Sequence, residues 1–201
     1  MYKYSKVLIF FLCLWPIYSL SYYIYFNQLG PDPIKKIMHH FGEWSLIFIC
    51  LTLAMTPLQR ITKSNFWVRH RRMLGLFVFF YVSVHLLVYV GLDYRFDWNS
   101  ISDDLIKKKY IYIGFSAWLL LIPLALTSSQ KMMIKLKSNW KKLHRLIYVI
   151  AAFGILHFIW MSKTIFFEPL IYLIIIVVLL TDPALIKNIK IVKAPKETNK
   201  I

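Results

Sequence analysis

The sequence predicts an all-α integral membrane protein, organised as a bundle of six transmembrane helices. The first observation is composition: 59% of the 201 residues are hydrophobic, above the roughly 45–50% of soluble domains, and the mean hydropathy is +0.57. The second is that the apolar residues gather in long runs, and a helix of roughly 20 residues crosses a hydrocarbon core about 30 Å thick. Backbone groups in lipid must pair within their own segment, so each run is expected to be a helix. We therefore predict one bundle over residues 1–186, followed by a basic tail at 187–201.

Six apolar runs can be placed in order, at residues 7–26, 37–57, 73–92, 110–127, 143–160 and 165–180. The first follows Lys3 and Lys6 as a signal peptide would. It is too long for the apolar region of a signal peptide and lacks a small-residue cleavage site, so we interpret it as an uncleaved span. The second has the shortest apolar part, because His39, His40 and Glu43 fall in its first turns. The third and fifth each carry one histidine among apolar neighbours.

Charge predicts the orientation. The net charge is +16, and most of the 25 Lys and Arg residues lie at the start of the chain, after spans two and four, and in the tail. The positive-inside rule predicts that this side, with both termini, is cytoplasmic. Clustering between spans argues against a nucleic-acid partner, and the tail is expected to be disordered or held at anionic headgroups. The largest outer segment, 93–109, is interpreted as a solvated loop, with a docking surface as the alternative.

Two histidines in separate spans lie at matched depth. His85 and His157 fall about 18 Å and about 21 Å along helices that start at 73 and 143. Neutral imidazoles facing each other from two helices can hold the iron of a b-type haem. The alternative is that each histidine only hydrogen-bonds to a neighbouring helix. Neither Cys13 nor Cys50 belongs to a CxxCH motif, so any haem would be held non-covalently.

A second set of polar residues lies at the predicted inner edge. His144 could ligate a second, inner haem, or lie at the interface near the headgroups. Its partner would be expected about 13 residues before His85, where Arg71 and Arg72 stand, and arginine does not ligate iron. His70 is close by, in what we interpret as a charged loop. Arg71 and Arg72 could pair with haem propionates, although the orientation rule also places arginines there.

The motifs of nucleotide enzymes are missing from the sequence. It contains no GxGxxG, Walker or GxSxG pattern. Electrons, if the chain carries them, must therefore come from a separate partner or from a lipid-soluble quinone. His39 and His40, at the outer edge of span two, could bind quinone, transfer protons or simply lie at the interface.

Several motifs then carry a family resemblance over residues 29–175. In order they are LGPDP (29–33), His39 followed by GEW (42–44), TPLQR (56–60), RRMLGLFVFFY (71–81) with His85, PLALTSSQKM (123–132), WKKLHRLIY (140–148), LHFIW (156–160) and EPLIY (168–172). With this order and spacing, the chain resembles the MsrQ (YedZ) family, the haem-binding membrane subunits of the bacterial periplasmic methionine sulfoxide reductase system. That family belongs to the ferric-reductase-like membrane cytochromes, which are related to the membrane part of NADPH oxidases.

The resemblance implies an electron-transfer subunit with no substrate-reducing site of its own. Electrons would pass from the quinone pool, or from a cytosolic flavin reductase, through haem b to a periplasmic molybdopterin enzyme that repairs oxidised proteins. The family's haem-ligand histidines match His85, His144 and His157. FMN is also attributed to the family, although the sequence shows no flavin motif.

One departure leaves the number of haems open at one or two. The wider oxidase pattern has two histidines on each of two helices, and here the third span has an arginine at the inner position. The alternatives to the main reading are a b-type cytochrome of a ferric reductase or oxidase, and a non-redox membrane transporter.

Overall fold

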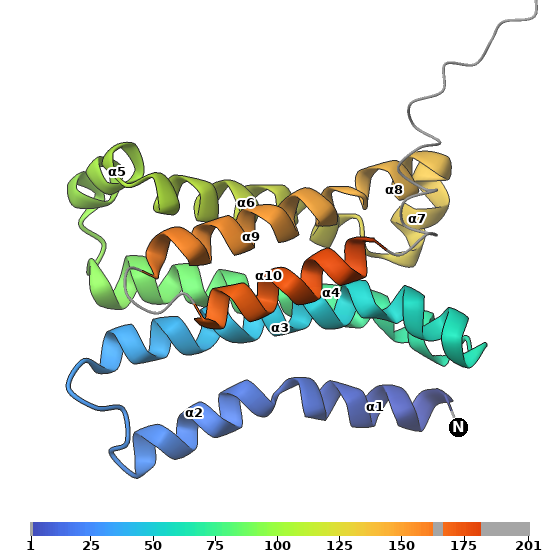
Figure 1. Cartoon of the computed structure of the whole chain (residues 1–201), viewed down its shortest axis with the longest axis horizontal. Helices are drawn as coiled ribbons and strands as arrows, with labels where there is room; N and C mark the ends of the chain where they lie inside the picture. The colour runs from blue at the N-terminus through green and yellow to red at the C-terminus, as the bar shows by residue number, and fades with distance from the viewer. Residues whose placement is uncertain (1, 163–166, 182–201) are drawn as a thin grey trace, which may run out of the picture.

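A computed structural model describes residues 2–162 and 167–181, and every regular element in these ranges is helical. The helices run along a common direction, with α5 at one end of the bundle and α7 and α8 at the other (Figure 1). They are α1 (Tyr2–Cys13), α2 (Trp15–Tyr25), α3 (Pro33–Thr62), α4 (Phe66–Leu87), the π-helix η1 (Val88–Asp93), α5 (Trp98–Lys107), α6 (Lys109–Leu126), α7 (Gln130–Leu136), α8 (Ser138–Leu143), α9 (Leu146–Met161) and α10 (Phe167–Leu180).

The predicted all-α membrane bundle is confirmed. Five segments of the described chain are long and apolar enough to cross a membrane. They are Tyr4–Tyr25, Pro33–Thr62, Phe66–Asp93, Lys109–Leu126 and Ser138–Met161. Helix α10 is apolar but has 14 residues, so the sixth crossing stays a prediction. The predicted tail at 187–201 lies outside the described residues, as does the end of the predicted bundle domain.

The first predicted span is two helices rather than one. Pro16 has no N–H with which to continue the helical ladder, and α1 ends at Cys13. The Ile17 N–H bonds to the Leu14 carbonyl at 2.9 Å, which tightens the turn between the helices. The hydroxyl of Tyr81, a fully buried residue of α4, donates to the Cys13 carbonyl at 2.6 Å. The proline therefore interrupts the helix of the first span, and Tyr81 of α4 supplies a hydrogen bond to a carbonyl at the interruption.

Helix α3 is longer than the predicted 37–57. It begins at Pro33, a position where proline is tolerated, and the side chain of Asp32, the capping residue before it, accepts a hydrogen bond from the Lys35 N–H at 3.2 Å. It ends at Thr62, and the capping residue that follows, Lys63, adopts a left-handed φ of 53°. Capping residues outside the apolar run therefore extend the helix beyond the hydrophobic segment.

Helix α4 begins seven residues before the predicted start at 73, at Phe66. The prediction that His70 lies in a charged loop is therefore wrong. His70 is in the second turn of α4, is 2% exposed, and donates from Nδ1 to the Phe66 carbonyl at 2.8 Å. Charged side chains end an apolar run, but at the membrane edge they do not end a helix.

The segment predicted as an outer loop contains helix α5. Asp97 caps it by accepting from the N–H groups of Asn99 and Ser100 at 3.2 and 3.3 Å. Ile101 is buried and Leu105, one turn later, is half-buried, which gives the helix an apolar face. The amphipathic pattern and the cap explain why this polar segment is helical.

Two helix pairs form the centre of the bundle. Helix α3 packs along α4, and α6 packs along α9, while α4 also contacts α6. Between α3 and α4, Phe48 stacks on Phe77 and Tyr81 with ring centroids 5.8 and 5.3 Å apart. Helix α10 packs against both α3 and α9 (Figure 1). The predicted span 143–160 is broken at His144 and Arg145, which separate α8 from α9.

Candidate functional site

The two histidines predicted at matched depth lie side by side. His85 comes from α4 and His157 from α9. Their ring centroids are 6.2 Å apart, and the ring planes meet at 89°. The fold therefore brings together two imidazoles that are 72 positions apart in the sequence.

Each imidazole is tied to a backbone carbonyl on a helix next to its own. His85 Nδ1 bonds to the Met38 carbonyl of α3 at 2.8 Å, and His157 Nδ1 bonds to the Tyr110 carbonyl of α6 at 2.7 Å. A carbonyl oxygen only accepts, so Nδ1 carries the proton and Nε2 keeps the lone pair. This is the tautomer that a metal-ligating histidine needs, with its second nitrogen held by an acceptor.

The spacing of the rings fits a shared metal ion. A metal–imidazole bond is about 2 Å long and the nitrogen lies about 1 Å from its ring centre, so two imidazoles that held one ion between them would have centres about 6 Å apart. The centroids of His85 and His157 are 6.2 Å apart. Within the described residues, no group of three or more His, Cys, Asp and Glu side chains gathers as a metal cage. A pair of imidazoles is the ligand set of a haem iron, whose other four ligands come from the porphyrin.

His144 lies apart from this pair, in the turn between α8 and α9. It stacks on Trp140 with centroids 3.9 Å apart, and its Nδ1 bonds to the Trp140 carbonyl at 3.1 Å. Its Nε2 is buried and makes no hydrogen bond to any described residue, although the Leu124 carbonyl is near. His144 thus has its Nδ1 bonded to a backbone carbonyl, as His85 and His157 do, and it lies at the opposite end of the fifth span from His157.

The two predicted arginines lie at the same end as His144. Arg71 is half-buried, and its Nη1 donates to Thr56 Oγ1 at 3.1 Å. Arg72 is exposed. Arg145 adds a buried guanidinium nitrogen, Nη1, that has no hydrogen-bond partner among the described residues. The structure therefore separates the predicted site residues into the pair His85 and His157 and a polar group at the other end, which keep the names outer pair and inner group after the sides predicted from charge.

A cluster of hydrogen bonds forms around Asp104, at the end of the bundle where α5 lies. Its carboxylate accepts hydrogen bonds from Tyr94, from Tyr89 at 3.3 Å, and from Lys108 at 2.6 Å. Burial acts to raise the pKa of the Asp104 carboxyl, but the bonds from Lys108 and Tyr94 outweigh it and lower the pKa below the ordinary 3.8. The same bonds raise the pKa of Tyr94 above 10.0 and that of Lys108 above 10.5. The cluster ties the segment after α4 to the start of α6, where Tyr110 lies.

Four supporting positions were not predicted from the sequence. Two are the carbonyls of Met38 and Tyr110, which as backbone groups leave no mark on residue type. The other two are Gly42 and Gly114, against which the imidazoles pack. The two pairs have the same spacing in the sequence: Met38 and His85 are separated by 47 positions, and so are Tyr110 and His157. This repeated spacing is the signal by which the supporting positions could have been found.

Comparison with known proteins places the chain in a family. Residues 37–155 match the model of the ferric reductase like transmembrane component. A protein-methionine-sulfoxide reductase heme-binding subunit MsrQ of Xanthomonas euvesicatoria is 49% identical over 154 residues, which is 77% of this chain and 71% of the relative. The subunit of the same name from Herminiimonas arsenicoxydans is 46% identical over 178 residues, 87% of this chain and 82% of the relative. The chain therefore belongs to the ferric reductase like transmembrane family, in the group of its members named MsrQ.

Proposed function

We propose that this chain is the haem-binding electron-transfer subunit of a methionine sulfoxide reductase system, in which His85 and His157 would hold one haem b. The observation that carries the proposal is the imidazole pair, with centroids 6.2 Å apart and each Nδ1 bonded to a carbonyl. A haem bound there would supply a one-electron carrier inside the membrane. The protein's own part is to present two Nε2 lone pairs and to hold both rings in place.

The proposed electron path runs outward. The donor is the quinone pool or a cytosolic flavin reductase, and the acceptor is a periplasmic molybdopterin enzyme that reduces methionine sulfoxide in oxidised proteins. The names of the relatives support a methionine sulfoxide reductase system as the destination. The charge distribution supports the direction, because the imidazole pair lies towards the end with fewer basic residues. FMN is a further cofactor of the proposed system.

The inner group is proposed as the site of a second haem. His144 would be an axial ligand, since its Nε2 is buried without a hydrogen bond to the described residues. Arg71 and Arg72 would neutralise propionates, and Arg71 already lies within electrostatic range of His144. No second histidine ligand is assigned, because the corresponding position on α4 is an arginine.

Haem content per chain, with a reduced-minus-oxidised spectrum of the purified protein, tests the proposal. Wild type is expected to show b-type bands, and His85→Ala and His157→Ala are each expected to lose the outer haem. His40→Ala is the matched control, because His40 also bonds to a carbonyl, that of Pro16 at 2.9 Å, but lies outside the pair. Unchanged bands in both ligand variants would remove the assignment.

The inner haem is tested by stoichiometry. If His144 ligates a second haem, His144→Ala should lower the haem content from two per chain to one while the outer haem stays. One haem per wild-type chain, retained in full by His144→Ala, would remove the inner site and leave the outer one.

The family model favours one other function, that of a ferric reductase. The two functions differ in what accepts the electrons. Membranes containing this chain should support reduction of protein methionine sulfoxide when the periplasmic enzyme is added, and should not reduce ferric chelates without it. The reverse result would favour the ferric reductase.

A further inference from the structure

Both imidazoles of the outer pair lie against a glycine of the neighbouring helix. A Cβ built on Gly42 of α3 would lie 3.2 Å from Cε1 and Nδ1 of His85. A Cβ built on Gly114 of α6 would lie 2.7 Å from Nδ1 and 2.9 Å from Cε1 of His157. The second approach is closer than real Cβ contacts permit, and the first is tighter than most. At both places the ring occupies space that any other side chain would need.

The two contacts share one geometry. In each case, the carbonyl that accepts from Nδ1 belongs to the residue four positions before the glycine: Met38 before Gly42, and Tyr110 before Gly114. In an α-helix that carbonyl also accepts from the N–H of the glycine itself. The ring therefore packs on one helical turn at the place where glycine has no side chain. The carbonyl at the start of that turn accepts two hydrogen bonds, one from the glycine N–H and one from the imidazole Nδ1–H.

The same arrangement recurs because the helix pairs α3–α4 and α6–α9 have the same pattern of positions in the sequence. Carbonyl, glycine and histidine all recur 72 positions later, at 38, 42 and 85 and again at 110, 114 and 157. The segments that follow the glycines are also similar, LAMTPLQR at 53–60 and LALTSSQK at 124–131, and KSN occurs at both 63–65 and 137–139. The α3–α4 and α6–α9 pairs thus repeat one helical hairpin, and each copy docks its histidine in the same way.

We infer that Gly42 and Gly114 are positioning residues that set the orientation and the Nδ1 hydrogen bond of the two imidazoles. The inference rests on the proposed function, since it concerns the ligands of the proposed haem. A carbonyl bonded to Nδ1 makes the imidazole a stronger ligand and fixes its plane. A methyl group at either glycine would push the ring away from the carbonyl, so the bond would lengthen and the plane would turn.

The test is Gly42→Ala and Gly114→Ala in the full-length chain, purified in detergent. Haem dissociation, the midpoint potential and the electron paramagnetic resonance of the ferric protein are measured for each variant. Gly114→Ala should weaken haem binding by about tenfold or more, as loss of a group that orients a ligand does. Gly42→Ala should have a smaller effect, because its contact is longer. Both should raise the midpoint potential and move the resonance g-values, which report ligand-plane orientation.

Gly75→Ala on α4 is the matched control. Its added Cβ would meet only Thr52 Cγ2, at an ordinary 3.9 Å. Alanine is a better helix former than glycine, so without a close contact the change should be neutral or slightly stabilising. Gly75→Ala is therefore expected to keep the wild-type affinity, potential and spectrum.

The outcomes separate this inference from the proposed function. If wild type holds haem through His85 and His157 but both glycine variants match it in affinity, potential and resonance, the inference is wrong and the function stands. If wild type shows no b-type haem, both are wrong. If Gly114→Ala does not elute as a folded protein in size-exclusion chromatography, Gly42→Ala decides alone, since its milder contact should allow folding.

Discussion

Asp104 joins three parts of the outer end through a single carboxylate. It receives hydrogen bonds from Tyr89 in η1, from Tyr94 after it, and from Lys108 just before α6. The Asp104 side chain is only 13% exposed, whereas those of the neighbouring pair, Asp103 and Lys107, are 60% and 70% exposed. Hydrogen bonds to a shielded charge contribute more than exposed ion pairs. This residue is therefore expected to fix α5 against the bundle.

Asp104→Asn should loosen α5. Loss of the charged acceptor is expected to cost about 1–3 kcal/mol locally, and so to speed amide exchange in α5 by about tenfold or more. Hydrogen–deuterium exchange of the purified protein measures this. Asp103→Asn is the control, because it removes an exposed pair worth about 0–1 kcal/mol and should change exchange little. Equal effects of the two changes would contradict this role for Asp104.

The pKa shifts in this cluster also predict how α5 responds to pH. Asp104 has a pKa below 3.8, so its contribution is complete above that value and is lost as the pH falls through the folded-state pKa. Lys108 and Tyr94 have raised pKa values, so their contributions are complete below about pH 10 and are lost as the pH rises further. Protection of α5, corrected for intrinsic exchange, should stay level from about pH 5 to about pH 9 and decline below about pH 4. In Asp104→Asn the acid decline should be smaller, and the part that remains should come from the Asp97 cap of α5, whose pKa is also lowered by its hydrogen bonds from Ser100 and Asn99.

At the scale of elements, the break between α1 and α2 depends on a side chain from α4. The Tyr81 hydroxyl bonds to the Cys13 carbonyl at 2.6 Å, and the residues of this contact are buried. A buried carbonyl that loses its partner costs about 1–3 kcal/mol, and little water reaches this position to replace it. Tyr81 therefore docks the broken first span onto the centre of the bundle.

Tyr81→Phe should let α1 separate from α4 more often. Cys13, 3% exposed beside this contact, should then react faster with a membrane-permeant maleimide, by about fivefold or more. The measurement is best made in a Cys50→Ser background, since Cys50 is the other free cysteine of the described residues. Tyr22→Phe, at an exposed tyrosine of α2, is the control. If the Cys13 rate in Tyr81→Phe stays at the control value, the hydroxyl does not hold the first span.

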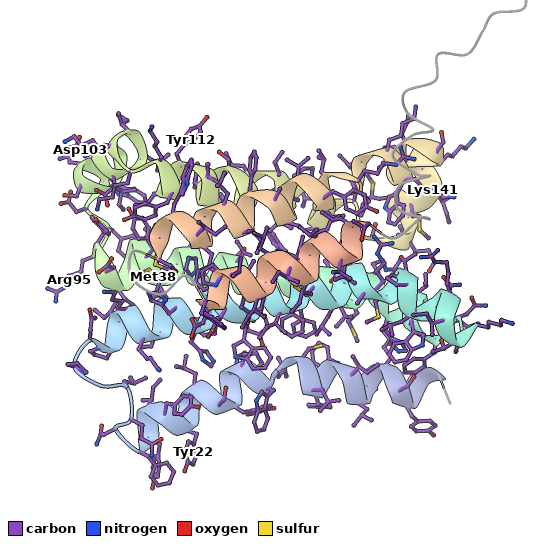
Figure 2. The ribbon with its side chains drawn as sticks, in the orientation of Figure 1. Tyr22, Met38, Arg95, Asp103, Tyr112 and Lys141 are labelled. Carbon is purple, nitrogen blue, oxygen red and sulfur yellow. The ribbon has the colours of Figure 1, made fainter. Side chains whose placement is uncertain are left out.

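For the whole molecule, the two ends of the bundle differ in charge. Asp103 and Arg95 lie at the end with α5, and Lys141 lies at the end with α7 and α8 (Figure 2). The second end also holds the connection between α3 and α4 and the start of α1 (Figure 1). Because basic residues are retained on the cytoplasmic side, we expect this end to face the cytoplasm.

Single cysteines test this orientation. In a chain lacking Cys13 and Cys50, Ser102→Cys on α5 should react with an impermeant maleimide added to spheroplasts. Ser64→Cys and Ser138→Cys should react only after the membrane is opened. Labelling of Ser64→Cys or Ser138→Cys in intact spheroplasts would show that the orientation is the opposite of the predicted one. It would also contradict the proposed direction of electron flow.

The sequence predicted the class of fold and the approximate place of each apolar helix, because crossing a membrane demands length and hydrophobicity that composition displays. It missed where helices begin and end at the membrane edge. Within charged segments, helix α5 is capped by Asp97 and the start of α4 carries the buried His70. Pro16 could have been read as a break, whereas the contact that closes the break, from Tyr81, lies 68 positions away.

The sequence by itself therefore determined that this protein is a helical membrane bundle and which histidines lie at matching depth. Both follow from residue type and spacing along single helices. Only the tertiary structure decided that the rings of His85 and His157 lie 6.2 Å apart, that Met38 and Tyr110 supply the carbonyls, and that Gly42 and Gly114 leave room for the rings. The rotation of one helix against another is set by packing between segments that are distant in the chain. Every residue has a backbone carbonyl, so the residue type does not show which carbonyl accepts a hydrogen bond from a histidine.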